Sequence, residues 1–384
     1  MISQNKNSNQ LKEQSIDSYL DRIMLDKGIV GIGAAIIVNK KVIWQKGFGY
    51  ADLEKEKPFT VKTLMNIASI SKTFTGACMM KAVEEEKISL DEDINNYLPF
   101  KIVNPNFPTE IITLRNIATH TSGLADRYPF YSDKTYFNGR DSSKLLGDFL
   151  KNYFSKDGKY YSEDNFLRHK PGTFRENSNI ASGLAVYIIE LKTGKKLNLY
   201  SQENIFKPLK MTKTGLFLSE INLFNHSKLY RKVKPQTNNI PLYGGTIFPD
   251  GGVRTSVSEL SKFFITLLND GEYKNRRILS KNSVQEMLTF QFTETNKPEN
   301  LQPSKLNSGL FWATKMGASR IGHNGSEPGM RTFMLSDLKK EIAVIIFFNT
   351  ELGEEEEGVY FDIYEELYKY GQKLKKDKKS VEKK

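Results

Sequence analysis

The segment Ile342–Phe348 constrains the fold more than any other part of the chain. All seven of its residues are apolar, so a strand here presents apolar side chains to both sides and needs cover on both. Tyr360, Ile363, Leu367 and Tyr370 follow at helical spacing. This spacing predicts a C-terminal helix that packs back on the sheet.

The N-terminal part of the chain supplies matching elements. Residues 30–38 and 41–50 are strand-like runs that meet at Asn39-Lys40 and predict a hairpin, and a short amphipathic helix is expected before them, ending near Gly28. Further strands are predicted at 310–314, 320–323 and 330–335. The expected fold class is α+β: an antiparallel sheet flanked by helices, built from both chain ends, with a mainly helical inserted domain.

Changes in composition along the chain predict its organisation. We expect a flexible N-terminal segment at 1–14, an α/β sheet domain from 15–99 and 246–372, a mainly helical domain at 100–245 and a lysine-rich tail at 373–384. Residues 126–170 are irregular, polar and aromatic. These residues predict a lid over a cleft, and the loop at 291–307 is expected to help shape the pocket.

The charge distribution argues against a nucleic-acid partner. The formal net charge is +11, but residues 373–384 alone carry +5, with no interleaved aromatic residues.

No apolar run is long enough to span a bilayer, so no integral membrane segment is predicted. Residues 1–14 lack the apolar core of a secretory signal. As written, the sequence predicts a cytoplasmic protein, and a periplasmic or secreted one if an export signal has been removed.

Ser69 and Lys72 form the pattern that carries most chemistry. A serine with a lysine three positions later on one helix face suits a nucleophile with its own base, provided that burial or nearby charge lowers the pKa of the lysine. Ser-x-x-Lys occurs elsewhere, but this copy opens an amphipathic helix after an apolar run. The alternative is that Ser69 caps the helix and Lys72 is solvated. Cys78, in the same helix, is expected to be a small core residue.

Five short motifs succeed one another along the chain. They are Ser69-Ile70-Ser71-Lys72, His120-Thr121-Ser122-Gly123-Leu124, Glu176-Asn177-Ser178-Asn179, Pro249-Asp250-Gly251-Gly252 and His323-Asn324-Gly325. With these motifs in this order, the sequence resembles the serine β-lactamase-like family, which includes class C β-lactamases, DD-peptidases, D-aminopeptidases and related esterases. The resemblance extends from about residue 28 to residue 350. No Gly-x-Ser-x-Gly elbow or zinc-type histidine spacing competes with this resemblance.

The resemblance implies roles for individual residues. Ser69 would be the acylated nucleophile and Lys72 would help to activate it. Asn179 would lie beside Lys72, orient it and bind a polar group of the substrate. His323 and Gly325 would form the third motif beside the cleft. The backbone N–H groups of Ser69 and Ser326 would form the oxyanion hole. His120, between small hydroxyl residues and a glycine, is expected to hold a turn by hydrogen bonds.

Asn177 departs from the family pattern. Members usually have tyrosine there, and asparagine cannot act as a general base. Three explanations stay open. Lys72 suffices alone; another group, such as His323 or a tyrosine from 126–170, substitutes; or the protein binds, or acylates once, without release.

The predicted activity is that of a serine hydrolase that forms an acyl-enzyme at Ser69. Its substrate is expected to be a small-molecule ester or amide, a D-amino-acid peptide and a β-lactam being among the candidates, and no metal or organic cofactor is expected. One alternative is a non-catalytic or slowly acylating binding protein on the same scaffold, motivated by Asn177. Another is an acyltransferase that uses the same residues.

Overall fold

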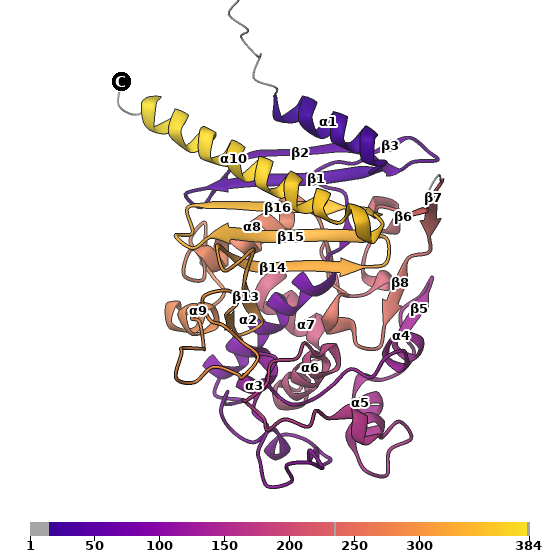
Figure 1. Cartoon of the computed structure of the whole chain (residues 1–384), viewed down its shortest axis with the longest axis vertical. Helices are drawn as coiled ribbons and strands as arrows, with labels where there is room; N and C mark the ends of the chain where they lie inside the picture. The colour runs from indigo at the N-terminus through magenta and orange to yellow at the C-terminus, as the bar shows by residue number, and fades with distance from the viewer. Residues whose placement is uncertain (1–14, 234–235, 382–384) are drawn as a thin grey trace, which may run out of the picture.

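An eight-stranded antiparallel sheet forms the centre of the molecule, and the structure, a computed structural model, describes residues 15–233 and 236–381 (Figure 1). The strands, in spatial order, are β12 (Ser308–Gly309), β13 (Trp312–Lys315), β14 (Arg320–Glu327), β15 (Met330–Asp337), β16 (Ile342–Phe348), β1 (Gly31–Val38), β2 (Lys41–Asp52) and β3 (Lys57–Pro58). In the middle, β1 pairs with β16 so that Ile32 lies opposite Phe348. The predicted α+β sheet built from both chain ends is therefore confirmed.

Helices cover both faces of the sheet and fill the region below it. They are α1 (Ile16–Lys27), α2 (Ser71–Glu84), α3 (Leu114–Ala118), α4 (Phe130–Thr135), α5 (Leu146–Phe154), α6 (Asn179–Thr193), α7 (Leu197–Ser201), α8 (Val257–Leu268), α9 (Lys281–Leu288) and α10 (Gly358–Val381). Helices α1 and α10 lie on one side of the sheet and α8 on the other (Figure 1).

Further short strands pair with one another outside the main sheet. They are the pairs β4 (Met65–Asn66) with β9 (Arg254–Thr255), β5 (Tyr136–Asn138) with β8 (Tyr243–Gly245) and β10 (Glu272–Tyr273) with β11 (Arg276–Arg277), and the three-stranded sheet of β17 (Thr350–Glu351), β6 (Leu229–Val233) and β7 (Gln236–Ile240). The pairing of β17 with β6 joins the inserted region 100–245 to the segment that follows β16. The division of the chain into domains stays a prediction.

Successive side chains of the central strands point to opposite faces of the sheet, and they form two apolar layers. Ile36 and Val344 pack in one cluster with residues of α1 and α10, whereas Ala35 and Ile345 pack in the other, larger cluster. The two-sided burial predicted for Ile342–Phe348 is thus confirmed, because every residue of β16 is buried. The predicted hairpin is also present.

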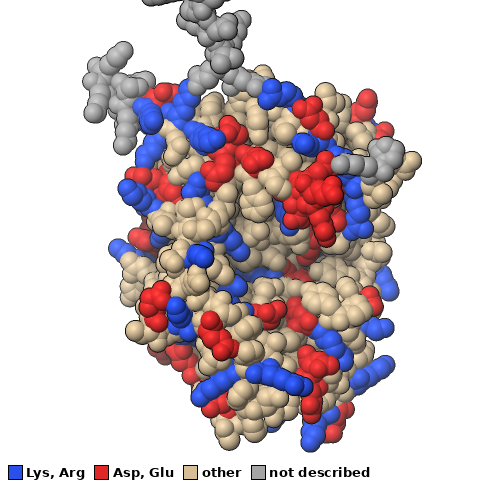
Figure 2. Space-filling view, in the orientation of Figure 1, with Lys and Arg blue, Asp and Glu red and all other residues tan. Residues whose placement is uncertain are grey.

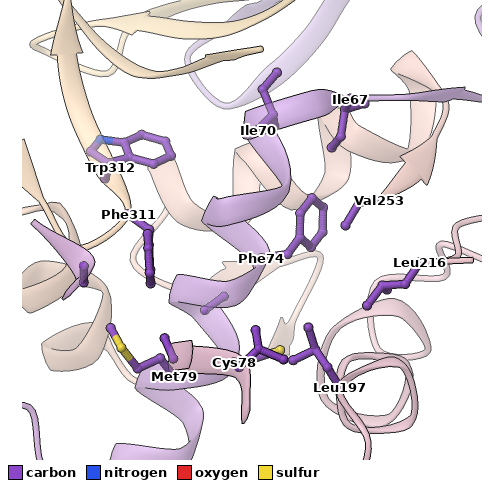
Figure 3. Packing of buried hydrophobic residues seen from close by; sticks show 14 of the residues in the cluster. Ile67, Ile70, Phe74, Cys78, Met79, Leu197, Leu216, Val253, Phe311 and Trp312 are labelled. Atoms are coloured by element: carbon purple, nitrogen blue, oxygen red, sulfur yellow. The ribbon is translucent and has the colours of Figure 1, made fainter. Parts of the chain in front are cut away.

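Helix α2 lies in the middle of the larger cluster. Phe74 and Cys78 face residues from the inserted region, and Phe311 and Trp312 pack on the other side of the helix (Figure 3). Cys78 is fully buried, and this burial raises the pKa of its thiol. It is the core residue that the sequence predicted. A helix surrounded in this way holds its first turn in a fixed position.

The C-terminal helix is longer than the sequence suggested. Residues 373–381, predicted as part of a separate lysine-rich tail, continue α10, which begins at Gly358. Lys375 reaches Glu341 at 2.7 Å, an ion pair that ties this part of the helix to the β15–β16 turn. The predicted flexible segment 1–14 lies outside the described residues.

Charges of both signs are interspersed over the face shown in Figure 2. Among the described residues, none of the helices combines the length and hydropathy that crossing a membrane requires.

Candidate active site

Ser69 lies at the junction of a 3₁₀ turn, Ala68–Ile70, with helix α2. Ala68 has φ 46°, a left-handed backbone that costs energy for a residue with a side chain. Ser69 is partly exposed in an otherwise buried stretch. Its Oγ accepts a hydrogen bond of 2.9 Å from Lys72 Nζ. The 3₁₀ turn therefore presents the serine hydroxyl to solvent, and the first turn of α2 places an amine behind it.

Lys72 is completely buried, so the alternative of a helix cap followed by a solvated lysine is wrong. Its Nζ also donates to the backbone oxygen of Asp250 at 3.3 Å. Burial lowers the pKa of Lys72, against the opposing effect of the carboxyl groups of Asp250, Asp126 and Glu327. In the described part of the chain, no carboxylate oxygen comes within ion-pair distance of Nζ. The environment thus favours the neutral amine that can accept a proton.

The third motif lies inside a strand and against the turn that carries the serine. The sequence predicted a strand that stops at His323, but β14 continues to Glu327. Gly325 makes this approach possible, because a Cβ there would lie 2.5 Å from Ile67 O and 2.8 Å from Ala68 Cβ. Thr332 Oγ1, on the neighbouring strand, donates to the same Ile67 oxygen at 2.9 Å. Strand β14 is thereby fixed beside Ser69.

His323 is a neutral imidazole in this arrangement. Its Nδ1 lies 2.7 Å from the backbone oxygen of Asn324, which can only accept, so Nδ1 carries the proton. Burial, with the charges of Lys315 and Lys72, holds its pKa well below the usual value. Burial and the charge of Arg175 also lower the pKa of Lys315, to about 8. These basic groups lie on the β13–β14 side of the site.

The second motif is organised by a residue that sequence reasoning missed. Asp126 accepts hydrogen bonds from Ser178 Oγ at 2.8 Å, Asn179 N at 2.7 Å and Ile180 N at 2.9 Å, at the beginning of α6. Ser178, and not Asn179, is the N-cap. Asn177 is exposed. Asp126 had no sequence signal beyond its position at the start of the predicted lid.

A cavity of about 500 Å³ adjoins the second and third motifs. Its lining includes Asn179 and Ser326, together with four tyrosines, Tyr128, Tyr131, Tyr136 and Tyr243. Three of these tyrosines come from 126–170, where the sequence predicted a lid. The loop at 291–307, expected to shape the pocket, contributes no lining residue.

Two carboxyl groups lie beside this cavity, and neither was predicted as a site residue. Asp250, from the Pro-Asp-Gly-Gly turn, accepts hydrogen bonds from Tyr131 and Tyr136. Glu327 Oε2 accepts hydrogen bonds from Tyr243 Oη and Asn66 Nδ2, both at 3.0 Å. Burial raises the pKa of both acids, and the charge of Glu327 raises that of Asp250 further.

His120 holds a turn, as expected, through its backbone. It has φ 61°, and its oxygen accepts a hydrogen bond of 2.8 Å from Glu176 N. The imidazole is buried edge-on against Phe311, and burial holds its pKa well below the usual value. Among the described residues, no group of three or more His, Cys, Asp and Glu side chains is arranged to hold a metal ion.

Comparisons with known proteins show which proteins the chain is similar to. The chain is 25% identical over 341 residues to protein flp of Staphylococcus aureus (strain MRSA252), a match that covers 88% of this chain and 63% of flp. This chain therefore spans less than two thirds of that relative. The structure resembles D-amino acid amidase from Ochrobactrum anthropi SV3, with a TM-score of 0.72, 22% identity and coverage of 94% and 98% of the two chains. It also resembles EstCE1, described as a hydrolase with promiscuous acyltransferase activity, with a TM-score of 0.67, 19% identity and coverage of 87% and 93%.

The family assignment rests on most of the chain. Residues 16–366 match the Beta-lactamase family, a span that contains the Ser69 turn, the Asn179 helix and the His323 strand. The chain belongs to the Beta-lactamase family.

Proposed function

We propose that this protein is a serine hydrolase that forms an acyl-enzyme at Ser69. The observation that carries the proposal is the 2.9 Å hydrogen bond between Lys72 Nζ and Ser69 Oγ, made by a lysine whose burial lowers its pKa. A neutral Lys72 would take the hydroxyl proton as Oγ attacks the substrate carbonyl. Departure of the alcohol or amine, with a proton returned to it, leaves the acyl group on Ser69. Water then releases the acid.

The other predicted residues have supporting roles in this proposal. The N–H groups of Ser69 and Ser326 would bind the developing oxyanion, each typically worth about 3 to 4 kcal/mol in the transition state. Asn179, at the start of α6 and in the cavity wall, would bind a polar group of the substrate. His323 would act as a neutral group beside the cleft, and Gly325 would let β14 approach the serine.

Lys72 would act without the tyrosine that family members usually have, and Tyr128, in the cavity wall with Asn179, would assist it. Its hydroxyl interacts with the side chain of Asn179, while burial raises its pKa. Tyr128 is therefore a protonated donor at neutral pH. It would give a proton to the leaving group rather than activate water.

Esters and amides are the proposed substrates. The neighbours include a D-amino acid amidase and EstCE1. Transfer of the acyl group to an alcohol or amine instead of water is an outcome of the same chemistry. β-Lactams are a further candidate class, because they acylate a serine in the same way.

Intact-protein mass spectrometry over a time course tests the proposal. The protein and its Ser69→Ala variant would be treated with 4-nitrophenyl acetate and with a β-lactam. We expect an added acyl mass on the wild type with at least one reagent and none on Ser69→Ala. Wild-type protein that stays unmodified while neither reagent is consumed would overturn the assignment.

A second candidate function is a slowly acylating binding protein, which the exposed Asn177 favours. Asn177→Tyr and the matched control Asn177→Phe separate the two candidates, because they differ only by a hydroxyl group. If a missing base limits release of the acyl group, Asn177→Tyr shortens the adduct lifetime at least about tenfold and Asn177→Phe does not. Equal lifetimes in both variants would exclude this candidate.

A further inference from the structure

The cavity beside Asn179 is bordered by an unbroken series of aromatic rings. The ring of Tyr128 lies 5.4 Å from that of Tyr131, Tyr131 lies 5.9 Å from Tyr136, and Tyr136 lies 5.6 Å from Tyr243, each pair edge to face. All four tyrosines line the cavity. Aromatic faces that border one space are suited to a cation, because the face of each ring is electron-rich.

Two carboxyl groups lie beside this space. Glu327 lines the cavity itself. Asp250 accepts hydrogen bonds from the hydroxyl groups of Tyr131 and Tyr136, which also line it. Gly251 packs so closely against Glu327 Oε1 that an added Cβ would overlap it. The carboxylate is thus held in place by backbone on one side and by Tyr243 and Asn66 on the other.

The nearby arginines are engaged elsewhere. Arg231 lines the cavity, but its Nε pairs with Glu351 at 2.9 Å. Arg254, which lowers the pKa of Glu327, donates its guanidinium hydrogens to the backbone oxygens of Leu216 and Gly252 as well as Tyr243. Neither guanidinium forms an ion pair with Glu327 among the described residues. Among the described residues the Glu327 carboxyl group therefore has no arginine ion-pair partner, and an ammonium ion in the cavity would favour its ionised form.

We propose that this tyrosine-lined cavity binds a positively charged ammonium group on the acyl part of the substrate. The proposal rests on the proposed acyl-enzyme at Ser69 and names the substrate class for that site. Glu327 directly follows Ser326, and Asn66, its hydrogen-bond partner, precedes Ser69 by three residues. An ammonium a few bonds from the reacting carbonyl would reach the cavity while the carbonyl lies at Ser69.

A pair of isosteric esters tests the preference in turnover. The 4-nitrophenyl esters of 4-(trimethylammonio)butanoate and 5,5-dimethylhexanoate differ only in a charged nitrogen that replaces a carbon. We expect wild-type kcat/KM to be at least about tenfold higher for the charged ester. Equal values, or a higher value for the neutral ester, would overturn the proposal.

Binding to Ser69→Ala separates failure of this inference from failure of the proposed function. Calorimetry would compare 4-(trimethylammonio)butanamide with 5,5-dimethylhexanamide. We expect the charged amide to bind at least about tenfold more tightly, whether or not the wild type turns over the esters. Turnover of neither ester would count against the acyl-enzyme alone, and equal binding of the two amides would count against the ammonium site alone.

Two variants and one control locate the effect. Glu327→Gln removes the charge, and Tyr128→Leu removes a ring whose side chain is 63% exposed, so that folding is not at risk. Each should reduce the ratio of charged to neutral binding, Glu327→Gln to about one and Tyr128→Leu by about threefold. Glu203→Gln, at a surface residue paired with Lys195 at 2.5 Å, removes the same charge elsewhere and should leave the ratio unchanged. A ratio that stays at its wild-type value in Glu327→Gln would overturn the assignment of this residue.

Discussion

A lysine on a protein surface is protonated at neutral pH and cannot take a proton from serine. Lys72 differs because it is completely buried, with its Nζ 2.9 Å from Ser69 Oγ and a second hydrogen bond to the backbone oxygen of Asp250. Burial penalises the charged form, and the resulting drop in pKa makes an ordinary side chain a base. The same burial of Lys72 lowers the free energy of unfolding of the protein.

Replacing Lys72 with methionine separates these two effects. The variant keeps a side chain of similar length without the amine. We expect kcat/KM for an activated ester to fall about 10²–10⁴-fold, while the urea midpoint at pH 7 stays equal to that of the wild type or rises.

The pH dependence of stability gives a second check on Lys72. Its pKa in the folded protein lies below the ordinary 10.5, so the unfolded chain binds more protons between those two values. The wild-type free energy of unfolding should therefore rise relative to that of Lys72→Met as pH increases through this window. Urea titrations at several pH values measure the difference, and a difference that falls with pH would contradict the burial argument.

The sequence identifies those site residues that belong to motifs, and it misses those that act through tertiary burial. Ser69 and Lys72 were predicted because their spacing on one helix face is local. Asp126 and Glu327 were not, since each is one acid in a polar stretch until the fold surrounds it with donors. Nothing in the residues next to them encodes that environment.

At the scale of elements, prediction succeeded where periodicity runs over several residues. The helix expected at the N-terminus is α1, which begins after the N-cap Ser15 and ends at Gly28 in the left-handed conformation. Strand β14 was cut short at His323, because Asn324-Gly325 resembles a turn. The short pairs β4–β9 and β5–β8 have too few residues for a pattern.

Gly325→Ala tests how tightly β14 must lie against the Ser69 turn. The new methyl group would lie 2.5 Å from Ile67 O and 2.6 Å from Thr332 Oγ1, so the strand must move away. We expect a loss of about 1–3 kcal/mol in the free energy of unfolding and a lower kcat, because the proposed oxyanion site opens.

Gly353→Ala is the matched control for Gly325→Ala. A Cβ at Gly353 meets nothing within 4 Å, and its φ is −64°. Its free energy of unfolding should stay within about 0.5 kcal/mol of wild type. If Gly325→Ala has the same free energy of unfolding and the same kcat as this control, then neither stability nor activity requires the close contact between β14 and the Ser69 turn.

At the scale of the whole molecule, the smaller core layer depends on the last helix. Tyr360, Ile363, Tyr364 and Leu367 are at most 1% exposed and pack against the sheet. The fold class could be predicted because apolar patterns at both chain ends required a common sheet. The insertion between them was predicted only in outline, because its loops pack on other loops.

Two truncations test the role of helix α10. A chain that ends at residue 357 loses the whole apolar stripe, and we expect it to lack cooperative unfolding by circular dichroism. A chain that ends at residue 372 keeps the apolar stripe and loses the lysine-rich end, including the partly exposed ion pair Lys375–Glu341. Its Tm should fall by no more than about 4 °C. A cooperative transition in the shorter chain would show that α10 is dispensable.

Because β1 pairs with β16, the ribosome makes β1 long before it makes this partner strand. Val30 N donates to Thr350 Oγ1, 320 positions later. At about 5–20 residues per second, a ribosome needs roughly 16–64 s to make the intervening chain. Throughout that interval β1, buried at all eight positions in the finished protein, has a hairpin partner on one side only. The nascent chain is therefore exposed to strand-to-strand aggregation until its last fifth emerges, and its yield should depend on translation speed more than on final stability.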